Sequence, residues 1–171
     1  MRASFGYIFW GLILVVLDFR INGFDLIPDF VGYALVGVGA AGLSQLSAQF
    51  ITAGALSSLL AVCDIVGMVT PTESAFFGIL VTIINCAMIW NLLGGVIVHA
   101  TDRGRPDLAE RAANRRIWYV GIMAVATALG LSGKVLGSAV AIVVVPLVVA
   151  GIVVMIMILH LIHRVRYELD Y

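Results

Sequence analysis

Acidic residues in and beside apolar sequence are the side chains of this chain best suited to chemistry. A short polar stretch near the N-terminus carries three aspartates and one arginine, namely Asp18, Arg20, Asp25 and Asp29. Asp64 lies inside a long apolar run, and Asn85 lies inside the next one. A carboxylate in a bilayer-embedded helix costs about 2.5–3.5 kcal/mol at mid-membrane, and such groups commonly bind ligands or ions. We therefore take these residues together as a candidate substrate or ion site.

The residues around Asp64 support its placement inside a helix bundle. Small and polar residues recur there every three or four positions, at Gly54, Ser57, Ala61, Asp64 and Gly67. This spacing indicates one helix face that is turned toward other helices. We expect Asp18, Asp64 and Asn85 to surround a cavity that opens outward. Arg20 would be the counter-ion of these acids. In the alternative interpretation the same groups form only a hydrogen-bond network between helices.

The polar stretch has the residue types of a turn followed by a helix start. It contains the turn dipeptide Asn-Gly at residues 22–23, and Pro28 suits the first turn of a helix. Asp25 or Asp29 can accept backbone N–H groups at that helix start. Two interpretations stay open: a hairpin that caps the helix, and an outward-facing ligand or cation site that uses Asp25 and Asp29.

The three histidines are the other potential metal ligands. His99, His160 and His163 are all expected near the cytoplasmic boundary of the membrane. A haem with two axial histidines, or a metal held by all three, is one hypothesis for them. No acidic side chain is placed to orient such ligands, so we predict no cofactor and no metal.

No catalytic motif accompanies these groups. The chain contains no HExxH, GxSxG or P-loop spacing, and we expect that it is not an enzyme. Cys63 and Cys86 lie in apolar runs without a CxxC pattern, so we interpret both as small buried residues.

The composition is that of an integral membrane protein. Of the 171 residues 62% are hydrophobic and 12% are charged, and the mean hydropathy is +1.10. A soluble domain is about 45–50% apolar and about 25% charged. Ten basic and ten acidic residues give no net charge, which argues against nucleic acid as a partner. The lipid bilayer is the expected surrounding.

Apolar runs of about 20 residues predict an all-α, polytopic bundle of six transmembrane helices in a single domain, residues 1–171. We expect the helices at residues 4–21, 30–48, 50–69, 75–100, 117–131 and 138–162. Gly32, Gly39 and Gly42 share one face of the second helix and favour close packing against a neighbour.

Residues 101–116 form the strongly charged segment of the chain. They predict a short surface helix that begins at Pro106, with Asp107 and Arg111 as an ion pair one turn apart. The arginines also set the expected orientation. If the N-terminus is cytoplasmic, six crossings leave Arg20 and Lys134 as the basic residues outside, and the other eight lie inside. The positive-inside rule therefore favours a cytoplasmic membrane protein with both termini in the cytoplasm.

The segment RINGFDLIPDFVGY, residues 20–33, resembles an element of small multi-pass bacterial membrane proteins of uncharacterised function. Those proteins carry the pattern L-[IL]-P-D-F-[IV]-G-Y before their second helix. The resemblance covers residues 20–33 only. It implies a bacterial membrane protein and carries no activity.

These features together predict a small integral membrane transporter, or the membrane subunit of one, with an outward-facing polar site. In helix count, size and first outer loop the chain resembles the substrate-capturing subunits of energy-coupling-factor vitamin transporters. That resemblance implies a small-molecule or ion ligand and a partner, either another membrane subunit or a cytoplasmic ATPase. The alternatives are a structural or regulatory protein that binds membrane proteins or lipid, and a haem-binding redox subunit.

Overall fold

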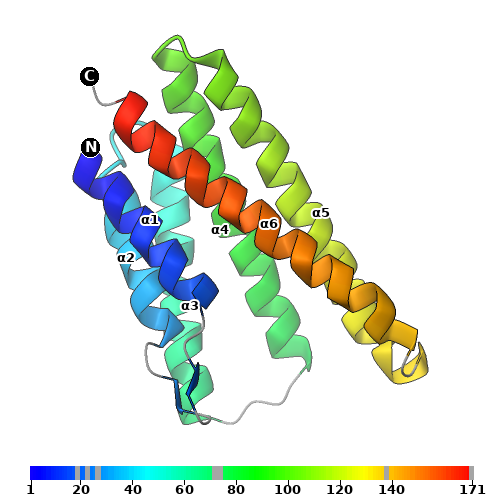
Figure 1. Cartoon of the computed structure of the whole chain (residues 1–171). Helices are drawn as coiled ribbons and strands as arrows, with labels where there is room; N and C mark the ends of the chain where they lie inside the picture. The colour runs from blue at the N-terminus through cyan, green and yellow to red at the C-terminus, as the bar shows by residue number, and fades with distance from the viewer. Residues whose placement is uncertain (18–19, 22–23, 26–27, 71–74, 137–138, 170–171) are drawn as a thin grey trace.

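The computed structural model is all-α, and the predicted fold class is confirmed at that level (Figure 1). It describes residues 1–17, 20–21, 24–25, 28–70, 75–136 and 139–169. Within this part of the chain the helices are α1 (Arg2–Leu17), α2 (Asp29–Ala41), α3 (Ala48–Val69), α4 (Ala75–Asp102), α5 (Pro106–Leu136) and α6 (Ala139–Glu168). Between α1 and α2, the two-residue strands β1 (Arg20–Ile21) and β2 (Phe24–Asp25) pair in antiparallel fashion.

Each helix packs against the next one along the chain, and α6 returns to pack against α1. Figure 1 shows both termini and the α4–α5 connection at one end of the bundle, and the β1–β2 pair at the opposite end. The distal halves of α5 and α6 continue past α1 as a separate helical pair. The bundle therefore has two chemically different ends, one rich in arginine and one that carries the predicted acidic site.

Among the described residues, three helices are long and apolar enough to cross a membrane by length and composition: α3, α4 and residues Val144–Glu168 of α6. α1 and α2 are apolar but shorter, and α5 begins with the charged sequence that follows Pro106. Helices of this kind support the interpretation of the chain as a membrane protein and are consistent with a membrane location.

Helix α2 is shorter than expected and ends at Ala41 rather than near residue 48. The chain then makes hydrogen-bonded turns, with the Leu43 amide on Ala40 and the Leu46 amide on Leu43. The Ser47 hydroxyl accepts a hydrogen bond from the Gln49 amide at 3.2 Å and so caps α3. Serine is a favoured N-cap, which explains why a new helix begins here instead of the old one continuing.

Helix α5 is one continuous helix where the sequence predicts a surface helix followed by a separate membrane helix at residues 117–131. Pro106 begins the helix as expected. Neither glycine nor proline occurs in residues 107–120, so no residue interrupts the helix where its charged part meets its apolar part. The predicted pair of Asp107 with Arg111 is wrong, because the Asp107 carboxylate binds Arg105 instead.

Glycines allow α1 and α2 to approach closely, as the shared face of Gly32 and Gly39 predicts. A Cβ at Gly39 would lie 2.6 Å from the carbonyl oxygen of Ser4, and a Cβ at Gly32 would lie 2.7 Å from that of Gly11. Both distances are to backbone atoms, which cannot rotate away as a side chain can. The prediction of close packing is confirmed, and the neighbouring helix is α1.

Aromatic packing joins α1, α3 and α4 at the arginine-rich end of the core. The Phe5 and Phe50 rings are fully buried and meet edge to face, with centroids 6.2 Å apart. Gly95 of α4 receives the Phe50 ring, since a Cβ there would lie 2.8 Å from two ring carbons. This packing fixes the positions of α3 and α4, two of the three helices that line the acidic cavity described below.

A first prediction concerns the α1–α2 contact. We expect Gly39→Ala to lower the free energy of unfolding by about 1–3 kcal/mol, because the added methyl overpacks a backbone contact. Gly121→Ala is the control, since no atom lies within 4 Å of a Cβ at that position of α5. Thermal unfolding of both variants in mild detergent measures the effect. Equal stability of the two variants would show that α1 and α2 do not pack this closely.

Candidate functional site

Asp64 binds the start of helix α2. Its Oδ2 accepts a hydrogen bond from the Phe30 backbone amide at 2.9 Å, across 34 residues of sequence. Pro28 occupies the N-cap position and makes no side-chain capping bond. A carboxylate at a helix N-terminus satisfies an exposed N–H group and interacts favourably with the helix dipole. The acidic residue in the middle of an apolar sequence therefore has a defined structural partner.

Asp64 also faces a cavity of about 290 Å³ between α2, α3 and α4. Asp29, from the first turn of α2, lines the same cavity, and so does the Tyr33 ring one turn later. The remaining walls are mainly apolar and include Leu60, Cys63, Met68, Phe77 and Val81. None of the described residues that line the cavity is basic. Two carboxylates, a phenol and apolar walls suit a small positively charged ligand.

Tyr33 connects this cavity to a hydrogen-bonded chain deeper in the bundle. Asn85 of α4 donates from Nδ2 to the Tyr33 hydroxyl at 3.0 Å, and its Oδ1 accepts from the Tyr119 hydroxyl at 2.6 Å. Both tyrosines are buried. The Ser57 hydroxyl donates to the Tyr33 backbone oxygen at 2.5 Å. Polar groups of α2, α3, α4 and α5 are thus joined through Tyr33 and Asn85, which holds the cavity in one arrangement.

The structure groups some of the predicted site residues and separates others. Asp29 and Asp64 share the cavity, whereas Asn85 is not among the residues that line it and reaches it through Tyr33. Asp18 lies outside the described residues. Arg20 and Asp25 are described by their backbones, which lie opposite each other in the β1–β2 pair, and their side chains lie outside the description. The expected outward cavity of Asp18, Asp64 and Asn85 stays a prediction because Asp18 lies outside the described residues, and within the described part of the chain Asp64 shares a cavity with Asp29 and Tyr33.

The predicted helix face around Asp64 is turned toward α2. Ser57 is fully buried against Tyr33, and a Cβ at Gly54 would lie 3.5 Å from the Ala40 side chain. Gly67 lines the acidic cavity. This agrees with the expectation that a small, polar face points into the bundle.

The histidines lie in different surroundings. His99 is buried and stacks on the Phe5 ring, with centroids 6.0 Å apart. His163 is exposed and contacts the rings of Phe9 and Tyr167, and His160 is also exposed. The described residues contain no group of three or more His, Cys, Asp or Glu side chains that could hold a metal ion. The geometry thus offers no three-ligand centre at His99, His160 and His163.

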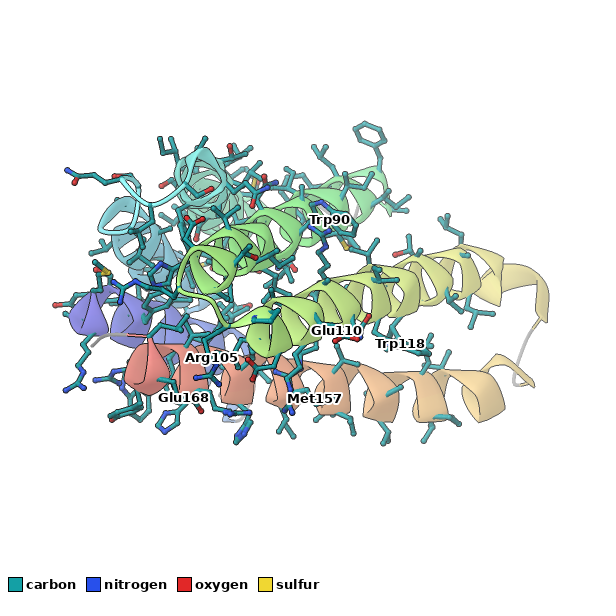
Figure 2. All side chains as sticks on the ribbon, turned by 90° about the horizontal axis from the view of Figure 1, so that it is seen from above. Trp90, Arg105, Glu110, Trp118, Met157 and Glu168 are labelled. Atoms are coloured by element: carbon teal, nitrogen blue, oxygen red, sulfur yellow. The ribbon has the colours of Figure 1, made fainter. Side chains whose placement is uncertain are left out.

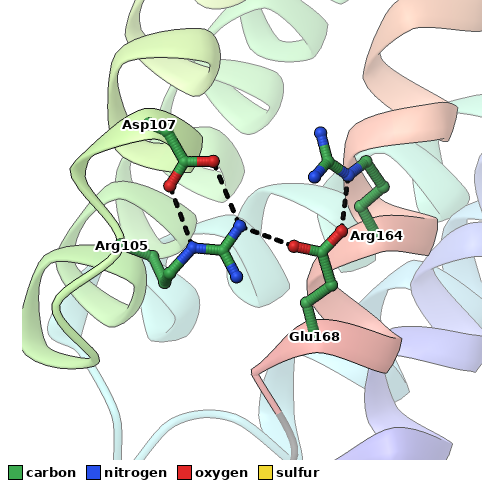
Figure 3. Close-up of polar contacts among 4 residues, drawn as sticks. All are labelled: Arg105, Asp107, Arg164 and Glu168. Carbon is green, nitrogen blue, oxygen red and sulfur yellow. Dashed lines mark hydrogen bonds and ion pairs between the residues drawn. The ribbon is translucent and has the colours of Figure 1, made fainter.

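A charged cluster closes the opposite end of the bundle (Figure 3). Arg105 binds the Asp107 carboxylate at 2.9 and 3.1 Å and the Glu168 carboxylate at 2.6 Å, and Arg164 binds Glu168 at 2.6 Å. The hydrogen bond from Arg105 lowers the pKa of Asp107. Figure 2 shows Arg105 and Glu168 together at this end, with Trp118 and Met157 farther along α5 and α6. The cluster joins the start of α5 to the end of α6.

Sequence reasoning missed the two tyrosines of the hydrogen-bonded chain. Tyr119 is 7% exposed and belongs to the core, whereas its neighbour Trp118 is 66% exposed. The spacing of Tyr119 from Leu108 and Ala112 could have indicated its burial, because these three residues share one helical face and that face is buried. Tyr33 stands four residues after Asp29 and therefore one helical turn further along the same face.

No protein-family model, curated protein or solved structure matches this chain.

A second prediction tests the role of Asp64 as the cap of helix α2. We expect Asp64→Ala to lower the free energy of unfolding by about 0.5–2 kcal/mol, the usual cost of a lost cap. Asp64→Asn should cost less, because its amide oxygen can still accept the Phe30 N–H. Asp102→Ala, at the exposed end of α4, is the control. Thermal unfolding in mild detergent compares the three, and an Asn variant as unstable as the Ala variant would contradict the capping role.

A third prediction concerns Asn85. We expect Asn85→Ala to lower the free energy of unfolding by about 1–3 kcal/mol, because it leaves two buried tyrosine hydroxyls without this partner. Asn91→Ala is the matched control on the same helix, since the Asn91 amide binds only the Ala87 carbonyl one turn earlier. Denaturation curves of both variants give the comparison. A loss no greater for Asn85→Ala than for Asn91→Ala would contradict the tyrosine–asparagine chain.

Proposed function

We propose that this protein is a small transporter of cationic solutes, or the membrane subunit of such a transporter. The observation that carries the proposal is the acidic cavity, in which Asp29, Asp64 and Tyr33 line one volume of about 290 Å³. This volume lies at the lower end of the range for small-molecule sites. A small amine or a hydrated metal cation has the matching size and charge.

We further propose that all six helices cross a bacterial cytoplasmic membrane and that both termini are cytoplasmic. One support is the sequence-based count of eight basic residues on the side of the termini. The other is that the N-terminus, the end of α6 and the α4–α5 connection lie at one end of the bundle (Figure 1). The acidic cavity lies toward the other end and then opens outward. α1 and α2 are short, but they pack on longer helices that can shield them from mismatch with the bilayer.

The cavity lies below the membrane surface in this arrangement. Asp64 stands five residues before the end of α3 at Val69, which is about 8 Å along the helix axis. Helix α2 has 13 residues and rises about 20 Å, while α3 has 22 and rises about 33 Å. A recessed site of this kind excludes much of the bulk water, so each carboxylate attracts a cation more strongly than it would at the surface.

A capping role for Asp64 alone does not account for the whole arrangement. A helix cap needs one acceptor, and the Phe30 amide uses only Oδ2 of Asp64. Asp29 and Tyr33 face the same cavity, and none of the described residues that line it is basic. A purely structural or regulatory protein has no need for this combination, which is the reason to prefer the solute-binding function.

Cys63 is a native reporter for the charge preference of this cavity. In a Cys86→Ser background, we divide the rate of each reagent at Cys63 by its rate with a free thiol. We expect this relative rate to be at least about tenfold higher for a cationic trimethylammonium-ethyl thiosulfonate than for the anionic sulfonatoethyl reagent. One unit charge at about 8 Å contributes about 2 kcal/mol at an effective dielectric constant of 20, which is more than tenfold. Asp64→Asn should reduce this ratio of rates, and a small amine such as ethylammonium should slow the modification.

Cys86 provides the matched control. It lines a separate, largely apolar cavity between α4 and α5, with Ile83 and Met123 among its neighbours. In a Cys63→Ser background the two reagents should react there without the preference for positive charge. Equal relative rates for both reagents at Cys63, or a ratio of rates that is unchanged in Asp64→Asn, would refute the proposed cation site.

A further inference from the structure

Arg115 is a charged residue on the buried face of α5. It lies on the same helical face as Leu108, Ala112 and Tyr119, all of which belong to the core. The Arg115 residue is 8% exposed. A guanidinium is permanently charged, so a position of this kind requires a counter-charge or a full set of hydrogen-bond acceptors.

The described residues do not supply that counter-charge. Nη1 of Arg115 is buried and has no hydrogen-bond partner among them. Two acids at this end of the bundle are engaged with other arginines, since Asp107 binds Arg105, and Glu168 lies between Arg105 and Arg164 (Figure 3). An unpaired buried charge is strongly destabilising, and it is seldom retained without a function.

Two other arginines act electrostatically on Arg115. Arg111 lies one turn earlier on α5, and Arg164 projects from α6. Burial, together with the positive charges of Arg111 and Arg164, lowers the pKa of the Arg115 guanidinium. Arg111 and Arg164 therefore repel the charge of Arg115, and an anion shared by the three guanidiniums would reverse the sign of this interaction.

We propose that Arg111, Arg115 and Arg164 form a binding site for a phosphate group. Each guanidinium can donate two parallel hydrogen bonds, and a phosphate offers enough oxygens to serve several of them at once. Arg111 is exposed and the Arg164 side chain is 29% exposed, so a ligand reaches the buried Arg115 between them.

The position of the site indicates where such a group comes from. Directly after Arg116 the helix becomes apolar, and Ile117 and Trp118 are exposed at 59% and 66%. Exposed apolar and indole side chains next to basic ones are typical of the membrane interface, where lipid phosphates lie. The phosphate therefore belongs either to an anionic phospholipid or to a free phosphate ion at the membrane surface.

The test measures thermal unfolding of the whole protein in detergent with added phosphatidylglycerol or inorganic phosphate. Phosphatidylcholine and sodium chloride at equal ionic strength are the reference additions. We expect one of the phosphate probes to raise the melting temperature of the wild type, as any ligand specific to the folded state does. Arg115→Met should abolish this rise and should not lower the melting temperature without the probe, since it removes an uncompensated buried charge.

Arg116→Met is the matched control, because Arg116 is the neighbouring residue and stacks on the Trp90 ring at 4.3 Å. It should keep the response to the probe. Arg111→Gln changes an exposed residue, and it replaces Arg115→Met as the test variant if Arg115→Met does not fold. It should raise the half-saturating concentration by about tenfold or more, as expected for a lost hydrogen bond to a charged group.

The outcomes separate the two sources of phosphate. A response to phosphatidylglycerol alone identifies a lipid site, and a response to inorganic phosphate identifies a site for the free ion. No response of the wild type to either probe would overturn the proposal. So would an equal response of the wild type and Arg111→Gln, or of the wild type and a folded Arg115→Met.

Discussion

The hydrogen bond from the Phe30 amide to Asp64 is the constraint on which the acidic end of this bundle depends. It fixes where α2 begins relative to α3, and it places a carboxylate at the positive end of the α2 dipole. Because α2 begins there, Asp29 falls in its first turn and Tyr33 one turn later. Both then face the cavity that Asp64 lines. One long-range contact thus accounts for the position of three polar groups in an otherwise apolar chain.

The remaining packing keeps that contact in place. Gly32 and Gly39 bring α1 against the back of α2, and Ser57 ties the Tyr33 carbonyl to α3. Asn85 then holds the Tyr33 hydroxyl and connects it to Tyr119 on α5. At the arginine-rich end, the ion pair of Arg105 and Glu168 joins the start of α5 to the end of α6. The two ends therefore differ in charge, which suits a protein that meets different chemistry on the two sides of a membrane.

Local sequence patterns predict the helices well and their contacts only in part. The glycine face of α2 and the face of small residues on α3 can be predicted from the sequence, because each follows from the periodicity of a single helix. The sequence patterns do not predict that residues 106–136 form one helix, because the change from charged to apolar residues suggests a helix boundary. Helix propensity requires no boundary there. The partner of Asp64 could not be read from the sequence, because it is a backbone amide 34 residues away. Arg115 was read as part of a charged surface helix, and only the packing of α5 shows that its side chain faces the core.

Native mass spectrometry of the protein, released from its own membranes in mild detergent, tests the cation-binding claim most directly. We expect the wild type to carry a small cation whose size fits the cavity of about 290 Å³. We also expect that Asp64→Asn, which keeps the capping oxygen but not the charge, is released without it. Wild-type protein that carries no small ligand, or a ligand retained equally by Asp64→Asn, would contradict the account.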